Sequence, residues 1–67
     1  MKYYILIGEM AKKGIRKTEI ARLLGIHWNS VANKLEGKTA FSVDEAIKIQ
    51  DTFFPDWKIE ELFRREE

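Results

Sequence analysis

The stretch LLGIHWNSVANKLEGK, residues 23–38, contains polar side chains whose types and spacing suit contact with another molecule. Asn29 and Asn33 lie four residues apart, so on a helix they share one face, one turn apart. An asparagine amide both donates and accepts, which allows a bidentate contact with adenine in a DNA major groove. Two solvated asparagines, or Asn29 as a helix cap, are the alternatives. We expect Asn29 and Asn33 to read bases.

Three neighbours of these asparagines are further candidates for base contact, namely His27, Trp28 and Ala32. Ala32 suits contact with a thymine methyl group, and His27, at the expected helix start, suits a phosphate or a base edge. A lone exposed histidine often has no special role. Trp28 can pack against DNA, or can lie at the rim of the core with its N–H in water. The sequence leaves both interpretations of Trp28 open.

Several side chains around this stretch suit contact with the phosphates of a nucleic acid. Lys17 stands at an expected helix start, where the helix N-terminus also attracts anions. Such contacts position a protein without specifying a sequence, and an ordinary solvated side chain is the alternative for each. Glu36 is expected to lie past the DNA or to pair with Lys38. The phosphate-contact candidates are Arg16, Lys17, Thr18, Lys34 and Lys38.

The charge of the chain is unevenly distributed. Residues 12–38 contain seven basic and two acidic residues, a net charge of +5. Residues 39–67 contain four basic and eight acidic residues, a net charge of −4, and residues 1–11 balance, which accounts for the total of +1. This asymmetry favours a basic face for a polyanion and an acidic face turned away from it, with an uneven solvated surface as the alternative.

The composition argues against several other classes of protein. The chain has one histidine and no cysteine, so we expect no metal site, no cofactor and no catalytic residues. The adjacent carboxylates Glu60 and Glu61 are explained as solvated charge, and no small-molecule ligand is evident. The apolar start MKYYILIGEM is too short and too interrupted for a signal peptide or a membrane span. We expect a soluble, cytoplasmic protein that consists of one domain, residues 1–67.

Glycines and one proline divide the chain into segments in which apolar residues recur at helical spacing. Five short helices are predicted: about 3–13, 17–24, 27–36, one that begins after Ser42 and ends before Pro55, and a last short one capped by Asp56. Ser42 and Glu45 form the pattern of a capping box. A strand over Tyr3–Ile7 is the one alternative to this all-α fold.

The predicted core follows from the same spacing. Ile20, Leu24, Ile26 and Val31 are the expected contacts between the second and third helices. Val43, Ala46, Ile47 and Phe53 are expected on the inner face of the fourth helix. An exposed remainder of the aromatic cluster is expected to form a dimer surface. This cluster consists of Phe53, Phe54, Trp57 and Phe63.

The segment KTEIARLLGIHWNSVANKLEG has the spacing of a helix-turn-helix, at about residues 17–36. Ala21 is small where the two helices cross, and Gly25 permits the left-handed backbone of a tight turn. Together with GKTAFSVDEAIKI, this segment resembles the Cro/repressor-type (XRE-like) helix-turn-helix family, particularly its short phage and prophage regulators. The matching positions are Ile20, Ala21, Leu24, Gly25, Ile26, Val31, Leu35, Gly37, Lys38 and Ser42.

The resemblance implies a lambda-repressor-like fold of five helices, double-stranded operator DNA as the ligand, and a homodimer on that DNA. Three positions depart from the family pattern: Lys17 replaces a glutamine, His27 replaces a Ser or Thr cap, and Lys34 replaces an apolar residue. The first two departures predict less well capped helix ends. The leading hypothesis is a transcriptional repressor of an inverted-repeat operator. The alternative is a protein-interaction module, antitoxin-like or polymerase-binding, that keeps the helix-turn-helix shape.

Overall fold

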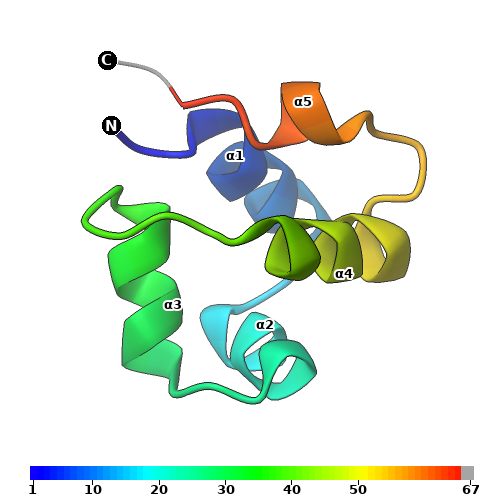
Figure 1. Ribbon diagram of the computed structural model, residues 1–67. Helices are drawn as coiled ribbons and strands as arrows, with labels where there is room; N and C mark the ends of the chain where they lie inside the picture. The colour runs from blue at the N-terminus through cyan, green and yellow to red at the C-terminus, as the bar shows by residue number, and fades with distance from the viewer. Residues whose placement is uncertain (66–67) are drawn as a thin grey trace.

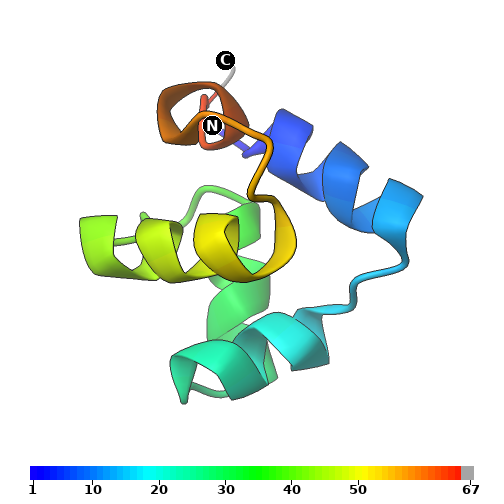
Figure 2. The same cartoon turned by 90° about the vertical axis from the view of Figure 1, so that its right-hand side faces the viewer.

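The computed structural model describes residues 1–65 of the chain. This part contains five α-helices joined by turns and loops, and no strand. Figures 1 and 2 show α2 at one end of the molecule, α1 and α5 at the other, and α4 between them, while α3 runs along one side in Figure 1. The all-α prediction is confirmed, and the alternative of a strand over Tyr3–Ile7 is wrong. The helices are α1 (Tyr4–Lys13), α2 (Lys17–Leu24), α3 (Trp28–Leu35), α4 (Val43–Phe53) and α5 (Ile59–Leu62).

The predicted ends of the first, second and fourth helices are confirmed. Gly14 and Gly25 follow α1 and α2 in left-handed conformation, and Phe54 ends α4 directly before Pro55. The φ angle of +69° at Gly25 is the one that a tight turn after a helix requires. From there the Ile26 N–H donates to the Ala21 carbonyl at 3.1 Å, and α3 begins two residues later.

The helix starts differ in how they are capped. Ser42 and Glu45 form the predicted capping box: the Ser42 N–H donates to Glu45 Oε1 at 2.8 Å, and the Glu45 N–H donates to Ser42 Oγ at 3.1 Å. At α2 the Arg16 side chain offers no acceptor, but Glu19 Oε1 accepts from the Arg16 N–H at 3.2 Å. The predicted Asp56 cap of α5 is wrong, because α5 begins after Lys58, which makes no side-chain cap bond.

The core is built from one or two large side chains of each helix. Of the predicted inner positions, Ile20, Val31 and Ala46 are buried, but the prediction for α4 is partly wrong. Val43 is 74% exposed and Ile47 is 40% exposed, whereas Ile49 is fully buried. The buried stripe of α4 runs through Ala46 and Ile49, and Ile47 lies about 100° from Ala46 around the helix.

The aromatic cluster belongs to the core. Phe54 is fully buried, and Phe53, Trp57 and Phe63 pack against the core as half-buried side chains. The most exposed large apolar side chains lie outside this cluster, at Met1, Tyr4, Trp28, Val43 and Ile47. A dimer surface formed by the exposed remainder of the cluster stays a prediction. No helix within residues 1–65 has the length and apolar character needed to cross a membrane.

Candidate nucleic-acid interface

α2 and α3 contact each other more extensively than any other two helices of the described chain. Ile20 and Ala21 of α2 and Val31 of α3 are buried, as predicted, while Leu24 and Ile26 are only partly buried. Because Ala21 carries no more than a methyl group, it lets the two helices approach closely. This packing fixes α3 on α2, and Figure 1 shows α3 along the outer edge of the molecule.

His27 caps the start of α3, contrary to the expectation that it leaves this end less well capped. Its Nδ1 accepts a hydrogen bond from the Asn29 N–H at 3.1 Å. The bond requires an unprotonated Nδ1, so in the neutral ring the proton is on Nε2. An imidazole thus serves where a serine or threonine hydroxyl would, and Asn29 is not the cap. The His27 ring is exposed and lies 5.5 Å from the Trp28 ring.

The outward face of α3 carries the amide side chains that the sequence singles out. Asn29 is exposed, and Asn33 and Ala32 are half-buried. Within residues 1–65, neither asparagine side chain makes an intramolecular hydrogen bond, so both amides keep their full donor and acceptor capacity. Asn29 lies one helical turn before Asn33.

A basic group of residues adjoins this face at the start of α2. Arg16, Lys17 and Thr18 are exposed, and they border the same hollow as Trp28 of α3. Lys38 is exposed just after α3. No ion pair within the described residues involves Arg16, Lys17 or Lys38. Their charges are therefore available to an anion.

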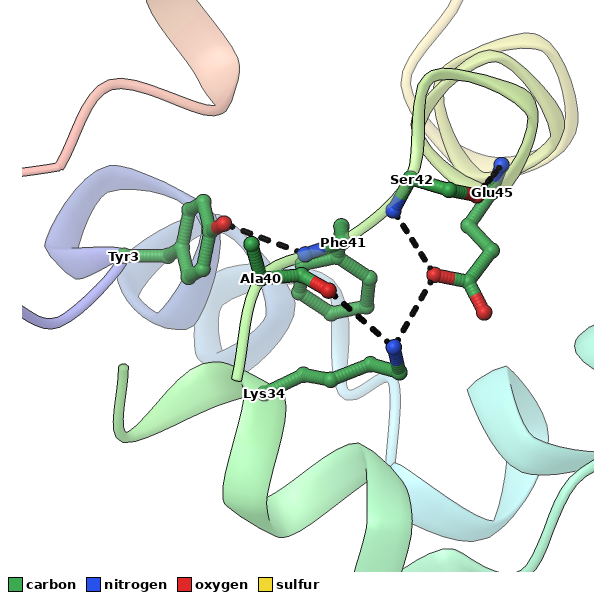
Figure 3. A network of polar contacts seen from close by, with 6 residues as sticks. All are labelled: Tyr3, Lys34, Ala40, Phe41, Ser42 and Glu45. Carbon is green, nitrogen blue, oxygen red and sulfur yellow. Dashed lines mark hydrogen bonds and ion pairs between the residues drawn. The ribbon is translucent and has the colours of Figure 1, made fainter. Parts of the chain in front are cut away.

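Lys34 is positioned differently from the other predicted phosphate contacts, because its ammonium points toward the start of α4 (Figure 3). Lys34 Nζ lies 3.2 Å from Glu45 Oε1 and donates to the Ala40 carbonyl at 3.1 Å. The two side chains are only 18% and 21% exposed. Lys34 thus joins α3 to the capping box of α4. Because its ammonium is occupied there, Lys34 is not available for the predicted phosphate contact.

Glu45 is held as a carboxylate at this junction. Its partial burial acts to raise the pKa, but the hydrogen bond from the Ser42 N–H and the charge of Lys34 outweigh burial and lower the pKa below the ordinary value of 4.5. Figure 3 shows both contacts on one carboxylate oxygen. The sequence indicates the capping box, but it gives no sign that Lys34 completes it.

The segment between α3 and α4 is fixed from the other side by Tyr3. The Tyr3 hydroxyl accepts from the Phe41 N–H at 3.2 Å, and the two rings pack edge to face with centroids 5.1 Å apart (Figure 3). Glu36 pairs with Lys2 at 3.2 Å, so its predicted pairing with Lys38 is wrong. The partner comes from the N-terminus, which sequence spacing alone does not bring near α3.

Trp28 lies at the boundary between the core and the surface. It is 51% exposed and lines the hollow that α1, the start of α2 and α3 enclose. Trp28 therefore lies partly against protein and partly in solvent. Its position fits the prediction of a residue at the rim of the core, and its contact with DNA stays a prediction.

Within residues 1–65, no group of three or more histidine and acidic side chains is arranged to hold a metal ion. Comparison with known proteins gave no match to a protein family, to a curated protein or to a solved structure.

Proposed function

We propose that this chain is a sequence-specific DNA-binding regulator, a small repressor of the Cro-like kind with a lambda-repressor-like helix-turn-helix. The observation that carries the proposal is the exposed face of α3, whose Asn29 and Asn33 amides have no internal partner within residues 1–65 and stand beside exposed cations without ion pairs. A packed helix pair joined by a tight turn at Gly25 is the geometry that presents such a face to a major groove.

Each residue of this surface has a distinct role in the proposal. Asn29 and Asn33 bond to base edges, and Ala32 contacts a thymine methyl group. His27 and Trp28 lie at the groove entry, where His27 also holds the first turn of α3 by its cap. The phosphates are contacted by Arg16, Lys17, Thr18 and Lys38, which set the position of α3 without reading the sequence.

Two copies of the chain would bind together. A dimer with twofold symmetry matches an operator with inverted half-sites about 10 bp apart, because each α3 then enters the same face of the duplex. Transcription is repressed when the occupied operator overlaps a promoter.

Selection from a random pool of DNA duplexes tests the proposal. At moderate salt we expect an enriched inverted repeat, with an affinity that falls steeply as salt increases because counterions are released. A pool recovered without any enriched motif contradicts sequence-specific binding. Asn29→Ala/Asn33→Ala is expected to broaden the motif, and Lys58→Gln, which changes a cation near α5 at the opposite end of the molecule, is the control.

A protein-interaction module is the second candidate, and one observation favours it. Val43 and Ile47 are exposed one turn apart on α4, where an apolar pair of this kind suits contact with a protein. A stable protein complex that depends on Val43 and Ile47, together with no DNA binding at any salt concentration, would favour this candidate over the regulator.

A further inference from the structure

A hollow of about 580 Å³ lies between α1, the start of α2 and α3. Its volume falls in the range of about 300–1,000 Å³ that small-molecule sites occupy. Met10 and Leu35 are buried at its base, and the Trp28 ring closes part of it while remaining half exposed. The apolar side chains that line it are Ile7, Met10, Ala11, Ile15, Trp28 and Leu35.

The border of this hollow is polar and mostly basic. Arg16, Lys17 and Thr18 form one part of it, and neither cation has an ion-pair partner among residues 1–65. Glu36 also borders the hollow, but its carboxylate is paired with Lys2 at 3.2 Å. The charge that remains for a ligand is therefore positive.

We propose that this hollow binds a small amphipathic carboxylate. Its apolar body would lie against Met10, Ile15 and the Trp28 ring, and its carboxylate would lie beside Arg16 and Lys17. Covering the exposed part of an aromatic ring removes apolar surface from water, which favours an apolar body. The two cations select a negatively charged head over a neutral or positive one.

The sequence gives no sign of this site because its residues come from separate segments. The apolar lining belongs to α1, to Ile15 and to opposite ends of α3, and the cations belong to the start of α2. Only the fold brings an apolar cavity and a basic border together.

Ligand binding here would oppose DNA binding, a consequence that rests on the proposed function. Arg16 and Lys17 are the cations assigned to phosphate contact, and Trp28 stands at the proposed groove entry. A carboxylate beside Arg16 and Lys17 offsets the charge that a phosphate would meet. The chain would then release its operator when the ligand accumulates.

Titration with 4-phenylbutyrate, compared with the neutral 4-phenylbutanol, tests the site directly. We expect nuclear magnetic resonance shifts at the Trp28 indole N–H and at the amides of residues 16–18, with the acid bound about two- to fivefold more tightly, as partly exposed charges allow. Shifts centred elsewhere, equal affinity for both compounds, or no shifts at millimolar concentration would overturn the proposal.

Two variants separate the apolar and the charged parts of the site. Ala11→Phe places a ring in the hollow from an exposed position of α1 and is expected to abolish binding, whereas Thr52→Phe on α4 is the matched control. Arg16→Gln/Lys17→Gln changes only exposed side chains and is expected to lower the affinity for the acid to that for the alcohol. Retained binding in Ala11→Phe or retained preference in Arg16→Gln/Lys17→Gln contradicts the proposal.

The same ligand added to the protein–DNA complex tests the consequence. We expect 4-phenylbutyrate to weaken binding to the selected duplex more than 4-phenylbutanol does. If the chain binds the acid but no DNA, the proposed function fails and the ligand site stands. If it binds DNA but not the acid, the ligand site fails alone. If the protein binds both the acid and DNA and neither weakens the binding of the other, the proposed competition is contradicted.

Discussion

The two ends of α3 are held in opposite ways. At the C-terminal end, the Tyr3 N–H donates to the Leu35 carbonyl at 3.2 Å, and Arg65 Nη2 donates to the Gly37 carbonyl at 3.0 Å. Lys34 and Glu36 add ion pairs to Glu45 and Lys2. The N-terminal end has the His27 cap as its one side-chain bond within residues 1–65, and Trp28 and Asn29 project into solvent.

This difference shows how one short helix is both positioned and exposed. Contacts from the N-terminus, the C-terminal segment and α4 converge on the C-terminal end and add to the packing of Val31 against α2, so α3 is oriented without using the side-chain amides of Asn29 and Asn33. The side-chain amides of Asn29 and Asn33 have no internal partner within residues 1–65 and are available to another molecule. A rigidly supported element with a free polar face is what a recognition site requires.

The Lys34–Glu45 contact is expected to give the largest effect. Lys34→Met removes the ammonium and leaves a mostly buried carboxylate, which should lower the free energy of unfolding by about 1–3 kcal/mol. Lys34→Met/Glu45→Gln should recover part of this loss, because the glutamine oxygen still accepts from the Ser42 N–H without carrying a charge. Urea denaturation of the single and double variants measures both values.

The exposed pair at the same end provides a matched control. The Lys2 and Glu36 side chains are 43% and 46% exposed, so Glu36→Gln should change the free energy of unfolding by less than about 0.5 kcal/mol. Equal effects for Lys34→Met and Glu36→Gln would mean that burial does not distinguish these pairs, and that the junction with α4 does not hold α3.

Substitutions on the outward face of α3 should change the specificity of DNA binding and not the stability of the fold. Asn33→Ala is expected to reduce discrimination at one operator position by about 1–3 kcal/mol, the value of a bidentate base contact. Its free energy of unfolding should stay the same or rise slightly, since alanine is the better helix former. Binding to duplexes with single-base changes measures the first effect, and Ser30→Ala is the control on the same helix. Unchanged discrimination would contradict a base-reading role for Asn33.

The cap at the N-terminal end should have a smaller effect on stability. His27→Ala leaves the Asn29 N–H without its acceptor and should cost about 0.5–2 kcal/mol of folding free energy. His27→Ser should restore most of it, since a hydroxyl caps the same amide. Thermal unfolding of the two variants checks this expectation, and equal stability of the two would show that the imidazole bond does not hold the first turn.

The features that the sequence predicts correctly are those that depend on residues close together along the chain. Gly25 and Pro55 act within a few residues of their own positions, and the Ser42–Glu45 box spans a single turn, so the end of α2 and both ends of α4 follow from the sequence. The prediction of which side of α4 faces the core is partly wrong, because Val43 and Ile49 fit a helical stripe equally well. The choice between them depends on which neighbouring helices the stripe meets.

The candidate site was predicted in part for the same reason. The exposure of Asn29 follows from the helical wheel once Val31 is inside. The pairing of Lys34 with Glu45 depends on the path of the chain between α3 and α4, and the Lys2–Glu36 pair depends on where the N-terminus lies. Like side chains such as Lys17 and Lys34 thus differ in role through contacts that no local pattern encodes.

The smallest expected effect is the acid response of the junction with α4. The pKa of Glu45 is lowered on folding, because the Ser42 N–H and Lys34 together outweigh the effect of burial. Its contribution to stability is therefore complete above the ordinary value of 4.5 and is lost as the pH falls through the lower pKa of the folded protein. Glu45→Gln should flatten this part of the pH profile of stability. Lys34→Met should raise the pKa of Glu45, since burial then opposes ionisation without the ammonium. Carbon-detected titration of the Glu45 carboxyl measures this directly, and a pKa at or above the ordinary value in the unaltered chain would contradict the proposed strength of the junction.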